Sequence, residues 1–132
     1  MLKLEIISPK EKVFSTEAKQ VVLPTESGEI GLLTGHIPMV TQLKLGALKV
    51  INDSSQEIFA IKGGFAQLVS DTISILTDEA VAASDLEASE IEQSINAVEK
   101  KLADSESASE KQSLSKRLKF YQLQESLLAQ RS

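Results

Sequence analysis

The chain of 132 residues contains no cysteine and only 1 histidine. Without thiols, a disulfide framework, thiolate chemistry and a cysteine metal site are excluded, and a reducing compartment is favoured. A typical zinc site needs three or four ligands, which a single histidine without cysteine cannot supply. We therefore expect no metal centre.

Long apolar runs and an excess of positive charge are also missing. No stretch approaches the ~20 apolar residues that cross a bilayer as a helix. Residues 1–6 lack the charged and then apolar layout of a signal peptide. The formal net charge of −5 opposes binding to a phosphate backbone. The sequence predicts a soluble mature chain that binds no nucleic acid and meets a membrane only through a partner.

Motifs for catalysis are absent as well. The sequence contains no Gly-x-Ser-x-Gly nucleophile elbow and no Gly-Lys-Ser/Thr phosphate-binding loop. His36 lies in a Gly–Pro segment, where a loop histidine bonded to nearby backbone is the commoner role. Glu26 and Glu29 could pair as the carboxylates of a small hydrolase, but two exposed loop acids are commonplace. We expect no catalytic residue, no nucleotide-binding site and no cofactor.

Glycine and proline do not occur after Ala83. Before it, turn signals separate short apolar or alternating runs such as Leu2–Ile6 and Ile73–Leu76. No helical crossover fits between these runs. The pattern predicts a compact all-β domain, a sandwich or barrel, over residues 1 to about 82.

The segment after Ala83 is predicted to contain two amphipathic helices. Ser84 and Glu87 have the spacing of a capping box, and Ser107 and Glu110 offer a second one. Apolar residues at helical spacing follow each box, and a polar turn separates the helices. Two such helices should pair antiparallel as a hairpin. The predicted apolar face of the first helix consists of Ile91, Ile95, Val98 and Leu102. The predicted face of the second helix is broader and consists of Leu114, Leu118 and Tyr121, flanked by Phe120, Leu123, Leu127 and Leu128.

The predicted fold class is therefore α+β, with an N-terminal all-β sandwich over residues 1–83 and a C-terminal antiparallel α-helical hairpin over residues 84–132. Acids outnumber lysines in residues 84–106, and basic residues outnumber acids in residues 107–132. The residues alone favour helices that attract each other through exposed pairs, worth only ~0.2–1 kcal/mol each, so that the hairpin can open. The alternative is that the basic helix exchanges its partner for another acidic surface.

Residues 23–50 contain closely spaced glycines and prolines among apolar residues. We expect the backbone there to turn tightly and repeatedly, with Glu29 and His36 inside the turns. A glycine-shaped loop that presents an acid and a histidine suits a contact surface. The glycines are Gly28, Gly31, Gly35 and Gly46.

The pattern Gly-Glu-x-Gly-x-x-x-Gly-His-x-Pro over residues 28–38 closely resembles the epsilon subunit of the F-type (proton-translocating) ATP synthase. Residues 63–67 and 73–80 add to the resemblance, which covers essentially the whole chain. Many family members have proline where this chain has Thr34. The resemblance implies a non-catalytic subunit with a β-sandwich followed by a helical hairpin.

Proteins of this family lie on the rotor stalk, bound to the gamma subunit and to the membrane-embedded ring of c subunits. The resemblance thus implies that the sandwich anchors the chain to the rotor, and that the chain helps to couple proton flow to ATP synthesis. The positions that match the family's ring-facing segment, which we assign to rotor contact, are Glu29, Gly31, Gly35 and His36.

The family's hairpin folds against the sandwich or extends along gamma to meet acidic segments of the catalytic beta subunits, where it restrains ATP hydrolysis. The resemblance thus implies a regulatory role for residues 84–132, and it favours partner exchange by the basic helix. The residues assigned to this inhibitory contact are Lys111, Lys116, Arg117 and Lys119.

Some bacterial relatives bind ATP through Ile/Leu-Asp-x-x-Arg-Ala at the start of the first helix. The nearest match here is Leu86–Ile91, in which Glu90 stands where the arginine would meet phosphate. Because like charges repel, we expect weak or absent ATP binding. This departure favours a cyanobacterial or chloroplast-like type, and the expected location is the cytoplasmic or stromal side of a bacterial inner membrane or thylakoid.

An alternative from another class is a free-standing β-sandwich binding module with a helical dimerisation hairpin. A rotor subunit should copurify with gamma and stay monomeric when isolated. The module should instead dimerise through its apolar helices.

Overall fold

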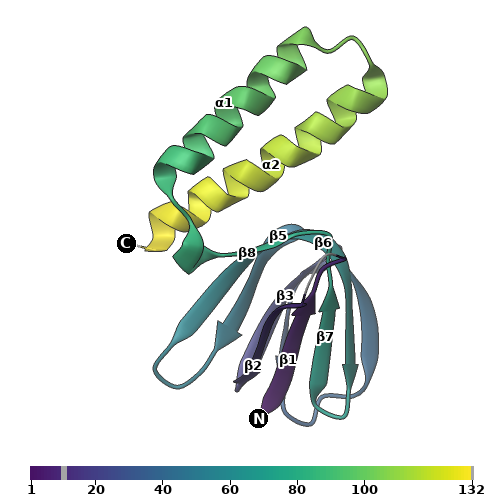
Figure 1. Ribbon diagram of the computed structural model, residues 1–132. Coiled ribbons are helices and arrows are strands. Elements are labelled where there is room, and N and C mark those ends of the chain that lie inside the picture. The colour runs from purple at the N-terminus through teal and green to yellow at the C-terminus, as the bar shows by residue number, and fades with distance from the viewer. Residues whose placement is uncertain (10–11, 132) are drawn as a thin grey trace. The chain divides into compact units, whose positions relative to one another are not determined.

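The computed structural model describes residues 1–9 and 12–131. The chain divides into two compact units, Met1–Ala82 and Ala83–Ser132. The first unit consists of strands and the second of helices, as Figure 1 shows. The predicted α+β class, all-β and then helical, is confirmed.

The β unit contains one continuous 8-stranded sheet in the order β2-β1-β7-β6-β5-β3-β4, with β8 paired to β6. Neighbouring strands are antiparallel except β1 and β7, which are parallel. The strands are β1 Leu2–Ile7, β2 Lys12–Ala18, β3 Gln20–Thr25, β4 Gly28–Leu33, β5 Met39–Ile51, β6 Gln56–Val69, β7 Thr72–Leu76 and β8 Ala80–Ala82.

Strand β6 is long enough to pair with two strands, β8 and β7, one after the other along its length. Its residues 59–61 pair with β8, whereas its residues 65–69 pair with β7. Gly63 and Gly64 lie where the partner changes, with φ angles of 85° and 125°. A Cβ at Gly64 would overlap the carbonyl oxygen of Leu76. Glycine therefore lets β6 bend while it stays close to β7.

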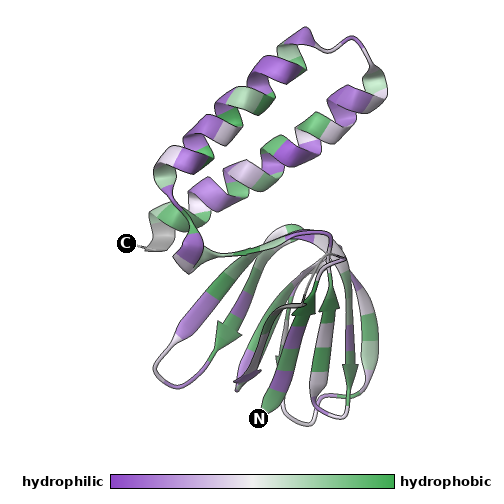
Figure 2. Ribbon diagram, in the orientation of Figure 1, coloured by the Kyte–Doolittle hydropathy of each residue, from purple (hydrophilic) through white to green (hydrophobic). Residues whose placement is uncertain are grey.

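Alternation of side chains fills the core of the β unit, because successive residues of a strand point to opposite faces. In β1, Leu2, Leu4 and Ile6 are buried. Lys3, between them, is exposed, and Figure 2 shows the same alternation in hydropathy along the strand. Each fully buried aliphatic side chain stabilises the fold by ~1.5–3 kcal/mol relative to an exposed one.

The helical unit contains the 3-10 helix η1 (Ala83–Asp85), then α1 (Ala88–Asp104) and α2 (Ala108–Arg131). The two α-helices pack antiparallel, as Figure 1 shows, so the predicted hairpin is confirmed. Within the described residues, no helix combines the length and the apolar character that spanning a bilayer requires. The buried apolar side chains are Ile91 and Val98 in α1 and Phe120 and Leu127 in α2.

The two predicted capping boxes have different outcomes. Ser107 caps α2, since the backbone N–H of Glu110 donates to Ser107 Oγ at 3.3 Å. Glu87 is the N-cap residue of α1, and its side chain makes no capping hydrogen bond. The predicted Ser84–Glu87 box is wrong, because Ser84 lies within the turn of η1 and α1 begins only at Ala88.

Candidate functional site

Glu29 and Gly31 lie in strand β4, so the expectation that Glu29 lies inside a turn is wrong. The turn is confined to residues just before β4, which forms a hairpin with β3. Ile30 is half-buried and Leu32 is buried on the inward face of β4, whereas Glu29 and Gly31 are exposed on the other face. Strand pairing therefore overrides the turn tendency of the Gly-Glu-x-Gly pattern.

Glu29 and Gly31 are both exposed, and each has one neighbouring side chain. The Glu29 carboxylate lies 3.8 Å from Lys49 Nζ, and its side chain is 60% exposed. An exposed ion pair of this kind contributes only ~0–1 kcal/mol to stability, so the Glu29 carboxylate can exchange Lys49 for a group of a binding partner. A Cβ at Gly31 would lie 2.8 Å from Gln20 Nε2, which shows that the Gln20 side chain approaches the bare backbone there.

Gly35 and His36 lie in the loop between β4 and β5, residues 34–38. The His36 backbone N–H donates to the Leu33 carbonyl at 3.1 Å, and Gly35 has a φ of 86°. His36 Nδ1 lies 2.8 Å from the Ile37 carbonyl oxygen. Because a carbonyl only accepts, Nδ1 carries a proton in this contact. This local backbone bond agrees with the commoner role expected for a loop histidine.

The four residues assigned to rotor contact form two groups rather than one. Glu29 lies near the start of β4, opposite Pro24 on β3. Leu33, at the other end of β4, lies four residue steps from Glu29, about 13 Å at the usual strand rise. His36 follows only beyond that end. Any partner that contacts both Glu29 and His36 must therefore cover the length of β4.

Two features around the loop were not predicted from the sequence. The Gly35 backbone N–H donates to Asp71 Oδ1, in the turn between β6 and β7, at 2.9 Å. Two apolar side chains are also exposed there: Ile37 of the loop at 74% and Val40, near the start of β5, at 71%. Ser70 and Asp71 are residue types that favour turns, but a contact 36 residues away in sequence has no local signature.

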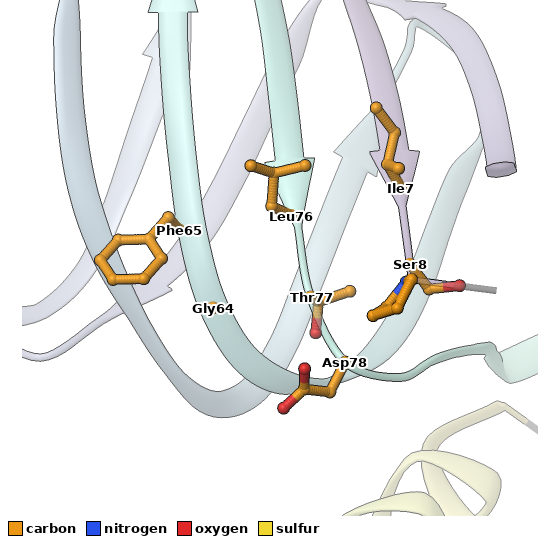
Figure 3. Close-up of a pocket in the computed structure, with 8 residues that line it drawn as sticks. Ile7, Ser8, Gly64, Phe65, Leu76, Thr77 and Asp78 are labelled. Atoms are coloured by element: carbon orange, nitrogen blue, oxygen red, sulfur yellow. The ribbon is translucent and has the colours of Figure 1, made fainter. Parts of the chain in front are cut away.

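A second surface lies on the face of the sheet formed by β1, β7 and β6. Leu76 of β7 lies between Ile7 of β1 and Phe65 of β6 in the strand register. Leu76 and Phe65 are each 54% exposed. They border a hollow of about 380 Å³, and Figure 3 shows its lining residues as sticks. Its lining residues are Ile7, Ser8, Pro9, Gly64, Phe65, Leu76, Thr77 and Asp78.

The residues assigned to inhibitory contact lie on α2. Lys111, Lys116 and Lys119 are exposed, and none forms an ion pair with another described residue. Arg117 is half-buried, with its guanidinium carbon 5.7 Å from the centre of the Tyr121 ring. These three lysines therefore do not provide the attraction between helices that the charge pattern suggested.

Comparison with known proteins identifies the family. Residues 1–83 match the family described as "ATP synthase, Delta/Epsilon chain, beta-sandwich domain". The chain belongs to the ATP synthase delta/epsilon chain family. The chloroplastic ATP synthase epsilon chain of Pyropia yezoensis is 34% identical over 110 residues, which cover 83% of this chain and 82% of the relative.

Members of the delta/epsilon family from different sources resemble this chain. The ATP synthase epsilon chain of Polynucleobacter necessarius subsp. necessarius (strain STIR1) is 37% identical over 87 residues, 65% of this chain and 63% of the relative. A chain in the cryo-EM structure of the Euglena gracilis mitochondrial ATP synthase has the same fold. Its TM-score is 0.78 at 24% identity, covering 96% of this chain and 81% of that chain. The predicted resemblance to epsilon subunits is confirmed, and the free-standing module is not favoured.

Proposed function

We propose that this chain is the non-catalytic epsilon subunit of the central stalk of an F-type ATP synthase. In this role it binds the gamma subunit and the c-subunit ring, helps to couple proton translocation to ATP synthesis, and restrains ATP hydrolysis. The observation that carries the proposal is the likeness to ATP synthase epsilon chains over most of the chain's length. Exposed polar and apolar surfaces on the β unit, which a binding subunit needs, support it.

Contact with the c ring is assigned to the outward face of β4 and to the loop of residues 34–38. Glu29 offers a carboxylate that the long contact to Lys49 leaves accessible. Gly35 and His36 are exposed in the loop. Charges at the edge of an interface mainly set its register and its rate of association. Glu29 and His36, at opposite ends of β4, would fix the orientation of the β unit on the ring.

Contact with gamma is assigned to the hollow between β1, β7 and β6. Phe65 and Leu76 leave about half of their surface exposed. Burial of apolar surface contributes roughly 25 cal/mol per Å². The hollow would thus supply the apolar centre of an interface, with Asp78 at its polar rim.

The helical unit is assigned the regulatory role. Lys111, Lys116 and Lys119 expose their charges along α2, and they can meet acidic segments of the catalytic beta subunits when the hairpin extends. Arg117 lies over Tyr121, four residues further along the helix, and this contact holds its guanidinium in a defined direction. Glu90 lies in the first turn of α1, where a negative charge opposes ATP binding.

The proposed location follows from the partners. The chain would sit on an energy-transducing membrane, a thylakoid or a bacterial inner membrane, on its cytoplasmic or stromal side. It would reach that membrane through gamma and the c ring.

Sedimentation of the full chain with purified gamma tests the proposal against the free-standing module. An epsilon subunit should sediment as a monomer alone and form a complex with one gamma chain. A module that dimerises through its helices should sediment as a dimer and leave gamma unbound. The second result would overturn the proposed function.

A further inference from the structure

We propose that Asp71 is a positioning residue that holds the loop of residues 34–38 in the shape in which it contacts the rotor. This inference rests on the proposed function and adds a residue that lies outside the loop. Asp71 acts through Gly35, whose backbone N–H donates to its carboxylate oxygen Oδ1 at 2.9 Å.

The backbone of Asp71 is itself held in place. Ser70 and Asp71 form the two-residue turn between paired residues Val69 and Thr72, with φ angles of 50° and 62°. Hairpin turns with positive φ at both central positions match the twist of the flanking strands. The Asp71 carbonyl also accepts the backbone N–H of Lys3 at 2.8 Å. The turn is thus fixed by β6, β7 and β1 together.

Asp71 has a backbone conformation that few residue types adopt. Glycine adopts positive φ without the steric penalty of a Cβ, and aspartate is among the few other residues that tolerate it. Ser70 and Asp71 are the non-glycine residues with positive φ in the described chain. Glycine at position 71 would suit the turn but could not supply an acceptor for Gly35.

The loop has little else to fix its shape. Residues 34–38 are all exposed, and a Cβ at Gly35 would meet no atom within 4 Å, so packing does not hold the loop. The other hydrogen bonds found for residues 34–38 are local ones, from His36 to Leu33 and between His36 and Ile37. Within the described residues, the hydrogen bond from Gly35 to Asp71 therefore connects the loop to the turn between β6 and β7.

The hydrogen bond between Gly35 and Asp71 affects how the loop can bind a partner. His36 and the 74%-exposed Ile37 follow Gly35 directly, so fixing the Gly35 amide limits the directions in which both side chains point. A loop that is already ordered in the free protein loses less conformational freedom when it binds. Asp71 would thereby strengthen rotor contact without touching the rotor.

Two substitutions separate the hydrogen bond from the turn. Asp71→Asn keeps an acceptor oxygen and tolerates positive φ, whereas Asp71→Gly keeps the turn and removes the acceptor. Affinity is measured with full-length protein and a purified gamma–c-ring complex. We expect Asp71→Gly to bind about fivefold to tenfold more weakly, and Asp71→Asn to bind within about twofold of wild type. The thermal midpoint of Asp71→Gly should not fall.

Two further readouts show whether Asp71 acts through the loop. The Gly35 amide should exchange its hydrogen faster in Asp71→Gly than in wild type or Asp71→Asn. His36→Ala should weaken binding less in the Asp71→Gly background than in wild type, because a free loop already presents His36 poorly.

Equal affinity of wild type and Asp71→Gly would overturn the role of Asp71, and so would an equal loss in Asp71→Asn. If the wild-type chain does not bind the complex at all, the proposed function fails and this role fails with it. The wild-type measurement thus distinguishes failure of the function from failure of the positioning residue.

Discussion

Phe65 and Leu76 lie opposite each other on strands β6 and β7, and each is 54% exposed. Paired residues in a sheet have neighbouring side chains, so the two form a single apolar surface at the edge of the 380 Å³ hollow. Exposed apolar surface of this kind commonly marks an interaction site. Substitutions of Phe65 and Leu76 therefore test whether the β unit binds gamma through this surface.

Phe65→Ser and Leu76→Ser should each weaken binding to isolated gamma by about tenfold, because buried aromatic and aliphatic anchors dominate interface energies. Titration calorimetry with full-length protein measures the effect. Leu33→Ser is the matched control, since Leu33 is 55% exposed but lies on β4. Equal losses for Leu33→Ser and Phe65→Ser would contradict the assignment of the hollow to gamma.

Gly64→Ala should be far more damaging than Gly35→Ala, although both glycines have positive φ. At Gly64 a Cβ overlaps the Leu76 carbonyl oxygen, and at Gly35 it meets open space. We expect a loss of ~3 kcal/mol or more in the free energy of unfolding for Gly64→Ala. The loss for Gly35→Ala should be about 1–2 kcal/mol. Urea denaturation measures both, and similar losses would show that the bend of β6 does not depend on Gly64.

Ser107→Ala should reduce the stability of the helical unit by ~1 kcal/mol, because it removes the oxygen that accepts the Glu110 N–H. Ser84→Ala should change stability by less than about 0.5 kcal/mol, because Glu87 is the N-cap residue of α1. Chemical denaturation followed by helical circular dichroism compares the two variants. An equal or larger loss of stability in Ser84→Ala would show that Ser84 caps α1, as the sequence predicted.

Much of the architecture could be predicted from local pattern. Alternating apolar residues in β1 and the loss of glycine after Ala83 indicate strands followed by helices, and the Ser107 cap is a local signal. The start of α1 could not be predicted in this way, because Ser84 is a good capping residue by type but the N-cap position is occupied by Glu87. Ser84 lies in the 3-10 helix η1, and α1 begins only after it, at Ala88.

The candidate site was harder to predict, because contacts between distant segments shape it. The Gly-Glu-x-Gly pattern suggests turns, yet pairing with β3 holds Glu29 in a strand. The hollow at Phe65 arises only once β1, β7 and β6 lie side by side. The bond from Gly35 to Asp71 joins two turns that no sequence motif connects.

Glu29→Gln should weaken binding to the gamma–c-ring complex by about fivefold and make that binding less sensitive to salt, because it removes a charge from the face of β4 that we propose contacts the ring. Glu26→Gln is the control, since Glu26 is an exposed acid in the turn just before β4. Surface plasmon resonance at several salt concentrations compares the two. If Glu26→Gln has the same effect, net charge rather than the position of Glu29 governs binding.

The three exposed lysines of α2 are expected to carry the inhibitory contact. Lys111→Ala, Lys116→Ala and Lys119→Ala together should leave gamma binding unchanged, because they lie on the helical unit and gamma is assigned to the β unit. The double substitution Lys100→Ala and Lys101→Ala on α1 is the matched control for loss of positive charge.

The central claim is tested most directly by ATP hydrolysis of an epsilon-depleted ATPase head that retains gamma. This head is titrated with the wild-type chain, the α2 triple variant and the α1 double variant. We predict that all three bind, that the wild type and the α1 variant slow hydrolysis, and that the α2 variant has lost most of this effect. If the wild-type chain neither binds nor slows hydrolysis, its assignment as a rotor-stalk subunit that restrains hydrolysis is wrong.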